Sequence, residues 1–280
     1  MPTQLLKVTP SRLATWAGCK RRFRMTYLDR PTPPRGGPWA HSTLGAVVHA
    51  ALRTFYATPP ARRTASVAQA ALAAAWTGEG FADAAQQAVY RARAQDWVAG
   101  YVSDHDPREV DAVGLERWVS APVGELVVEG RVDRIDARSR GQHRPPAPDA
   151  AEVVVVDYKT GQRGLSVAAA AGSQALALYV LASRHTLRRP CSRVELHHLP
   201  TGEVHGFDHT PATLAQAVQH AQEQAQAIAR ATKSLVAGGD PEVLFPPRPA
   251  PSCSWCDFRR SCPEGAAASP RREPWAGLAP

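Results

Sequence analysis

A run of four valines at positions 153–156 restricts the folds open to this chain more than any other feature. A short, uninterrupted apolar run of β-branched residues is typical of a strand buried on both faces. Asp157, Tyr158 and Lys159 follow it directly. Because side chains alternate along a strand, Asp157 and Lys159 should point to one face and Tyr158 to the other. The run therefore predicts a buried strand that ends with a carboxylate and an ammonium group on the same side.

A second strand with an acidic residue near its end precedes this one. The heptapeptide GRVDRID at 130–136 places Asp133 in a stretch with strand periodicity. Two carboxylates and a lysine that converge suit phosphodiester hydrolysis, because carboxylates bind one or two hard divalent cations that polarise the phosphate and activate water. The lysine can orient that water or neutralise the developing charge. A D-x-K triplet alone could equally close a hairpin, so the interpretation depends on both strands together.

Helical segments are expected on either side of these strands. The apolar period changes from helical to alternating near residue 114 and back again later in the chain. The predicted fold class is therefore α/β, with a mixed central β-sheet flanked by helices. A polar, proline-rich loop is expected at 139–150. The expected helices cover 11–29, 43–56, 64–102 with a break at 77–78, 174–183 and 211–236, and the expected strands cover 114–120, 125–136, 153–156, 193–199 and 203–207.

The charge balance favours a polyanionic partner. The 280 residues include 33 Lys+Arg against 25 Asp+Glu, which gives a formal net charge of +8. Phosphates attract such a surface and counterion release adds to binding, although an arginine-rich compositional bias would give the same balance. No apolar run approaches the roughly 20 residues of a membrane-spanning helix, and the N-terminus lacks the features of a secretory signal. A cytoplasmic protein without membrane contact is the expectation.

Four of the five cysteines form a pattern that suits a metal centre. Cys253, Cys256 and Cys262 lie close together near the C-terminus, and Cys19 lies near the other end. Four thiolates are enough to hold one iron–sulfur cluster, while a C-x-x-C pair also suits zinc or redox chemistry. Cys191 fits neither pattern and is interpreted as a buried or incidental thiol.

Aromatic and basic residues lie near these cysteines in the sequence. Trp16, Trp39 and Trp255 could stack on unpaired bases, but tryptophans more often fill a core. The basic run at 20–22 and the pair at 259–260 could bind phosphates or could form a solvated surface. Both roles stay open for each of them.

Three motifs together resemble the RecB-like exonuclease family of the PD-(D/E)XK nuclease superfamily. They are GRVDRID at 130–136, DYKTG at 157–161 and GAVVH at 45–49, which is similar to a G-x-x-x-H helix of that family. The resemblance spans residues 11–263 and implies a restriction-endonuclease-like core. It also implies a site for Mg²⁺ or Mn²⁺ formed by His49, Asp133, Asp157 and the Tyr158 carbonyl, with Asp133, Asp157 and Lys159 as the catalytic residues.

The same resemblance suggests three accessory residues. Glu116 stands where the family often has an acidic residue in the first strand of the sheet. The family also tends to carry a Q-x-x-x-Y helix after the lysine strand, but here four residues separate Gln174 from Tyr179. That departure leaves the role of Gln174 open. Tyr179 could contact DNA or could be a core tyrosine.

RecB-like nucleases of the iron–sulfur type, including helicase-associated and CRISPR-adaptation branches, carry a similar lone cysteine and terminal triplet. The resemblance implies a [4Fe–4S] cluster held by four thiolates that joins the two ends of the chain, with a four-cysteine zinc site as the alternative. The implied organisation is one nuclease domain over 1–264, with a helical segment at 57–112, an N-/C-terminal iron–sulfur lobe formed by 11–30 and 245–264, and a flexible tail at 265–280. The thiolates are those of Cys19, Cys253, Cys256 and Cys262.

The function implied by this resemblance is metal-dependent hydrolysis of DNA. We expect an exonuclease that acts on single strands or DNA ends in repair or recombination, with a helicase as a candidate partner. The chain has no G-x-x-x-x-G-K-[ST] phosphate loop, so it supplies no ATP motor of that type. Two alternatives remain open: a catalytically inactive DNA-binding module, and a zinc-clasped scaffold or RNA-processing protein.

Overall fold

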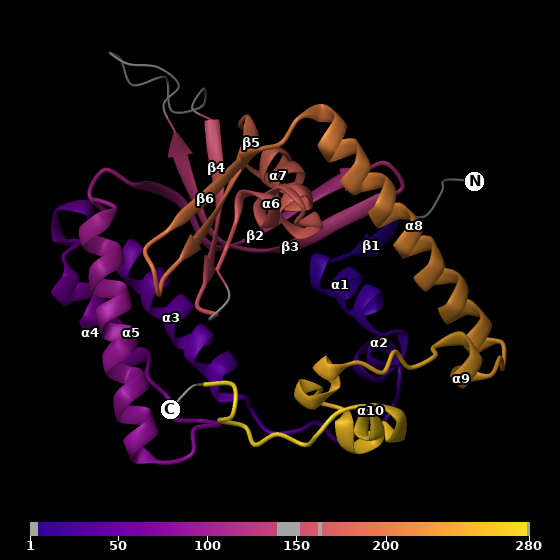
Figure 1. Ribbon diagram of the computed structural model, residues 1–280. Coiled ribbons are helices and arrows are strands. Elements are labelled where there is room, and N and C mark those ends of the chain that lie inside the picture. The colour runs from indigo at the N-terminus through magenta and orange to yellow at the C-terminus, as the bar shows by residue number, and fades with distance from the viewer. Residues whose placement is uncertain (1–4, 139–151, 162–163, 279–280) are drawn as a thin grey trace.

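A mixed β-sheet with helices on both faces forms the body of the protein (Figure 1). The computed structural model describes residues 5–138, 152–161 and 164–278. The strand order is β1-β3-β4-β5-β6, and β2 pairs with β3 off this path. The β1–β3 and β4–β5 pairs are parallel and the others are antiparallel. The strands are β1 Leu6–Val8, β2 Asp111–Val123, β3 Leu126–Arg138, β4 Glu152–Lys159, β5 Cys191–His198 and β6 Val204–Asp208.

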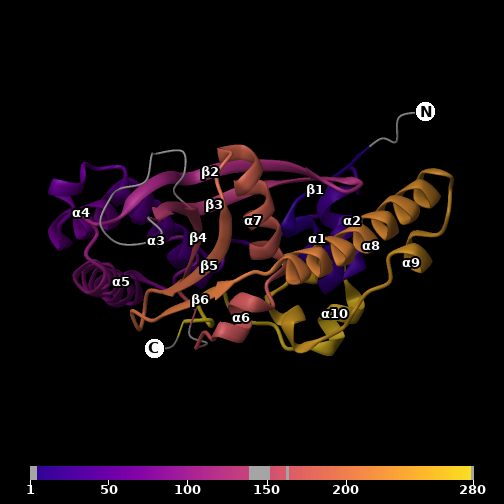
Figure 2. The ribbon, with the colours of Figure 1, turned by 90° about the horizontal axis from the view of Figure 1, so that it is seen from above.

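The helices divide between the two faces of this sheet (Figure 2). Helices α3, α4 and α5 enclose one apolar core against β4, while α7 packs on the opposite face and α8 lies across α7 and α1. The α-helices are α1 Pro10–Gly18, α2 Lys20–Tyr27, α3 Ala40–Tyr56, α4 Ala65–Ala75, α5 Ala84–Asp104, α6 Val167–Ala171, α7 Gln174–Leu187, α8 Pro211–Val236, α9 Pro241–Leu244 and α10 Pro263–Ala268. The α/β class with a mixed sheet is therefore confirmed.

Strand β4 is buried on both faces, as the valine run predicts. Val153 and Val155 pack in the core formed with α7, whereas Val154 and Val156 pack in the core formed with α3, α4 and α5. None of the four is more than 4% exposed. Full burial of one such side chain stabilises the fold by about 1.5–3 kcal/mol, so this strand anchors both layers.

The predicted helix over 11–29 is wrong in one respect, because it is two helices that meet at Cys19. The backbone of Cys19 is extended (φ −163°, ψ 119°), so it ends α1 and begins α2. Trp16 and Phe23, on opposite sides of this break, meet edge to face with ring centroids 5.3 Å apart. Both also belong to a small core with Phe245. The burial of three aromatic rings in one core offsets the lost helical hydrogen bonds.

The segment expected to be a flexible tail, at 265–280, packs against the body of the fold over its described part. Residues up to Ala268 form α10, and the following segment returns to α3, where the Ala40 amide donates to the Pro274 carbonyl at 3.1 Å. Leu278 is only 8% exposed and joins the core around α3. Apolar burial at the end of the segment therefore fixes it. The loop expected at 139–150 lies outside the described residues.

No helix in the described ranges is both long enough and apolar enough to cross a membrane.

Candidate metal centre

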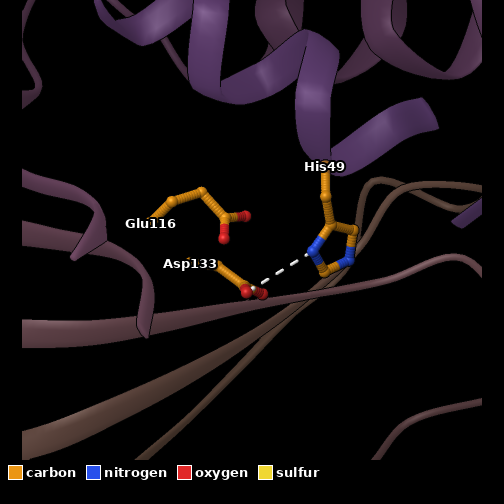
Figure 3. Close-up of side chains that lie close together, drawn as sticks. All are labelled: His49, Glu116 and Asp133. Atoms are coloured by element: carbon orange, nitrogen blue, oxygen red, sulfur yellow. Dashed lines mark ion pairs between the residues drawn. The ribbon is translucent and has the colours of Figure 1, made fainter. Parts of the chain in front are cut away.

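Three side chains of types that bind metals, from three separate elements, converge beside the middle of β3 (Figure 3). His49 lies on α3, Glu116 on β2 and Asp133 on β3, and one ligand atom from each lies within 4.8 Å of the others. The Nδ1 of His49 lies 3.4 Å from Oδ1 of Asp133. The other Asp133 oxygen accepts the backbone N–H of Tyr158 at 3.0 Å. Both oxygens of this carboxylate are thus held in place, one toward the imidazole and one toward β4.

The G-x-x-x-H pattern on α3 has a steric explanation. Gly45 and His49 are one helical turn apart and lie on the same face. A Cβ at Gly45 would lie 3.3 Å from Oγ1 of Thr160, the residue that follows β4. The small residue therefore lets α3 approach the end of β4, and this approach brings His49 to Asp133.

Glu116 reaches the group through an unusual backbone conformation. Its φ is +46°, in the left-handed region that costs a non-glycine residue roughly 1–3 kcal/mol. The neighbouring pairs in the ladder are Leu115 with Arg134 and Arg117 with Val132, so Glu116 lies opposite Asp133. Strand pairing on both sides holds the conformation. Arg131 fixes the carboxylate, with its Nε 2.8 Å from Oε2 of Glu116.

Asp157 and Lys159 form an ion pair beside this group, on the same face of β4 as predicted. The Tyr158 side chain between them points the other way, is 3% exposed and accepts a hydrogen bond from Arg134 at 2.7 Å. Burial raises the pKa of Asp157 despite the opposing charge of Lys159. Asp157 is close enough to His49 and Asp133 to act on them electrostatically, but it is not one of the group within 4.8 Å.

The charges of this site are coupled. Burial alone would lower the pKa of His49, but its hydrogen bond to Asp133 and the charges of Asp133, Asp157 and Glu116 raise it. Burial alone would raise the pKa of Asp133, but the hydrogen bond and charge of His49 lower it. Three carboxylates thus face two cations, Lys159 and Arg131, and one imidazole. When His49 is neutral, as a metal ligand must be, one negative charge is left over, and a hard divalent cation, which prefers carboxylate oxygens, would offset it.

An open cavity of about 630 Å³ extends from the three converging residues. Gly130, Arg131 and Tyr179 form part of its wall. The ring of Tyr179 lies on Gly130, where an added Cβ would come within 2.7 Å of Cε1. Burial and the charges of Asp133 and Asp157 raise the pKa of the Tyr179 hydroxyl. Position 130 therefore has to be glycine, because a larger side chain there would clash with the ring of Tyr179.

Replacing Gly130 by alanine should destabilise the fold by about 1–3 kcal/mol, because the ring of Tyr179 must move from a packed position. Urea unfolding measures this change. The same replacement should cost little in a Tyr179→Ala background, where the obstacle is absent. Gly100→Ala is the matched control, since an added Cβ there meets nothing within 4 Å and a helical alanine is favoured. Equal destabilisation in both backgrounds would contradict the assignment.

Gln174 does not enter this cavity. It is the first residue of α7, and its side-chain amide lies 3.5 Å from the Ala217 carbonyl of α8. The side chain therefore points to the neighbouring helix, which agrees with the irregular spacing between Gln174 and Tyr179. The accessory role suggested by the family pattern has no geometric support at this position.

The four cysteines named in the sequence line a second, smaller cavity of about 130 Å³. Its lining comes from α1, α2 and the C-terminal segment at 247–265. Figure 1 shows this segment returning to the region of α1 and α2. An added Cβ at Gly265 would lie 3.3 Å from Sγ of Cys262 and 3.5 Å from Sγ of Cys253. Arg21 is 5% exposed, lies 3.8 Å from Sγ of Cys262 and forms ion pairs with Glu242 and Glu264.

The fifth cysteine belongs elsewhere. Cys191 is the first residue of β5 and is 1% exposed in the core beside α7. Burial raises the pKa of its thiol to about 12. It is therefore an inert core residue, in agreement with the interpretation of a buried thiol.

Comparison with known proteins identifies the family. The sequence profile of the PD-(D/E)XK nuclease superfamily matches residues 7–263. The chain belongs to this superfamily, whose members are generally metal-dependent nucleases. No curated protein matches the chain. Among solved structures, the crystal structure of SSO0001 is similar, with a TM-score of 0.35 and 13% sequence identity over 92% of this chain and 85% of that chain.

Proposed function

We propose that the protein is a divalent-metal-dependent deoxyribonuclease of the RecB-like branch, acting as an exonuclease on single strands or DNA ends. The observation that carries the proposal is the convergence of His49, Glu116 and Asp133 beside the Asp157–Lys159 ion pair. Oxygen and imidazole donors around an excess of negative charge fit Mg²⁺ or Mn²⁺. The proposed ligands are His49, Asp133, Asp157 and the Tyr158 carbonyl, with Glu116 as an additional donor.

The side chains of the proposed site would have different roles in hydrolysis. A bound cation would polarise the scissile phosphate and lower the pKa of its water. Asp133 is held in place by the Tyr158 amide, and His49, whose Nδ1 lies 3.4 Å from the other Asp133 oxygen, would bind the cation in its neutral form. Lys159 is 46% exposed and can place its ammonium group against the charge that develops on the phosphate.

We further propose that Cys19, Cys253, Cys256 and Cys262 hold a [4Fe–4S] cluster. Their common cavity supports this assignment, because a cavity of about 130 Å³ leaves room for a group larger than one ion. In a four-cysteine zinc site each sulfur lies only about 2.3 Å from the metal, so the sulfurs gather around a point. The cluster would join α1 and α2 to the C-terminal segment and act as a structural staple.

The proposed setting is DNA repair or recombination, alongside a helicase that would supply the unwound strand. The net charge of +8 supports a nucleic-acid substrate. The alternative of an inactive DNA-binding module is disfavoured because Asp133, Asp157 and Lys159 are all present. Asp157 and Lys159 pair on β4 on either side of Tyr158, whose N–H Asp133 accepts. A vestigial site has no chemical need for all three.

Cleavage of end-labelled single- and double-stranded DNA tests the proposed activity. We expect the wild-type protein, purified without oxygen, to cut with Mg²⁺ or Mn²⁺ and to stop when EDTA removes the cation. Lys159→Ala should bind DNA but cut at least about 100-fold more slowly, because a preorganised charge is lost from the transition state. Product lengths over time distinguish exonuclease from endonuclease action. DNA binding without cleavage by the wild type would favour the inactive binding module.

A further inference from the structure

One exposed aromatic residue lines the cavity of the proposed metal centre. Trp118 lies on β2, two residues after Glu116, and is 58% exposed. It lines the same cavity as His49, Glu116 and Asp133. A single exposed apolar side chain is common on a protein surface, but this indole lies in the wall of the cavity, where its face is available to a planar group of a ligand.

The other tryptophans near the functional regions have partners within the fold. Trp16 is 7% exposed and packs edge to face with Phe23 and Phe245. Trp39 and Trp255 meet each other with ring centroids 5.1 Å apart. The base-stacking role that the sequence left open for these three residues therefore has weaker support than the same role for Trp118.

Basic residues on the cavity wall identify the kind of ligand. Arg131 pairs with Trp118 across the β2–β3 ladder, and its side chain is 63% exposed even though it contacts Glu116. Arg53 lines the cavity from α3, one turn beyond His49. Cationic guanidinium groups beside an exposed indole match a chain of phosphates that carries planar bases.

We propose that Trp118 stacks on an unpaired base of the substrate strand and thereby positions the neighbouring phosphate at the His49–Glu116–Asp133 group. A base inside a duplex has both faces covered by its neighbours, so an indole can stack only on an unpaired or terminal base. Trp118 is thus a specificity-determining residue that favours single strands and frayed ends. The assignment rests on the proposed nuclease function and names the feature of the substrate that the site recognises.

Binding measured without cleavage provides the first test. In a Lys159→Ala background, fluorescence anisotropy of a labelled single-stranded oligonucleotide should show about tenfold weaker binding for Trp118→Ala, as expected for the loss of one base–aromatic stack. Trp118→Phe should retain most of the affinity, because it keeps a ring. Trp275→Ala is the matched control, since Trp275 is 37% exposed and lies in the C-terminal segment. Affinity for a covalently closed circular duplex, which has neither unpaired nor terminal bases, should change little in all three variants.

An abasic scan locates the stacked base. A series of oligonucleotides is prepared, each lacking one base at a different position. For the Lys159→Ala protein, and for Trp275→Ala in that background, one of these oligonucleotides should bind about tenfold more weakly than the intact one. Trp118→Ala should be insensitive to the same abasic position, since the partner of the base is already gone. Equal binding by the Trp118 and Trp275 variants, or an abasic effect that persists without Trp118, would overturn the assignment. Neither result affects the cleavage of DNA by the wild-type protein. The stacking role of Trp118 and the nuclease function are therefore tested independently.

Discussion

Asparagine in place of Asp133 should abolish cation-dependent cleavage, with a loss of at least about a thousandfold, while the protein stays folded. The amide oxygen of asparagine can still accept the Tyr158 N–H that Asp133 accepts at 3.0 Å. It carries no charge, however, so it attracts a divalent cation far less. The pKa of His49 should also fall, because the hydrogen bond and charge of Asp133 are among the interactions that raise it.

Two measurements separate loss of the cation from loss of the fold. Cleavage rates are titrated with Mn²⁺, and thermal unfolding is followed with and without the cation. Binding to the native state alone stabilises a protein in proportion to the logarithm of ligand concentration, so wild-type protein should gain stability and Asp133→Asn should not. Asp111→Asn, at the exposed start of β2, is the matched control and should behave as wild type. Rapid cleavage by Asp133→Asn would remove this carboxylate from the proposed site.

Serine in place of Cys256 should remove the brown colour of the anaerobically purified protein and lower its thermal midpoint by about 10 °C, as expected if the cluster contributes about 4 kcal/mol. Cys256 lines the same cavity as Cys19, so its loss should open the contact between the N-terminal helices and the C-terminal segment. The ion pairs from Arg21 to Glu242 and Glu264 are too few to replace four covalent ligands. Iron content, visible absorbance and calorimetry measure the change.

Cys191→Ala is the control for this experiment, because Cys191 lies in a different core and should leave the iron content unchanged. Unchanged absorbance in Cys256→Ser would contradict the cluster assignment. Zinc in the wild-type protein, with no visible absorbance, would favour the four-cysteine zinc site instead.

Local pattern was sufficient to predict the parts of the fold whose backbone is regular. Strand β4 was predicted because four valines can be buried only between two apolar layers, and the orientation of Asp157, Tyr158 and Lys159 follows from alternation. Helix α8 begins and ends where it was predicted, at Pro211 and Val236. Thr210 caps it, proline fits its first turn, and two glycines follow its end.

Features that depend on distant contacts could not be predicted in the same way. Gly18 is a weak local sign of the break at Cys19, and the packing of Trp16 against Phe23 and Phe245, which favours the break, is not visible in the sequence. The left-handed backbone at Glu116 is held by strand pairing rather than by its own preference. The periodicity of the sequence does not show that Trp118 is on an exposed face of β2. It also does not show that Leu278 packs in the core around α3.

The position of the cysteine cavity has a consequence for the order of assembly during synthesis. Arg21 and Cys262, which meet there, are 241 positions apart in the chain. A ribosome therefore delivers the metal-centre residues on α3, β2 and β3 well before the last thiols emerge. Until then Cys19 has no nearby sulfur partners, and α1 and α2 lack the segment that holds them. If the four thiolates hold the proposed cluster, its iron should be inserted only after Cys262 has emerged, and a chain clipped before the last cysteines should lack the expected colour.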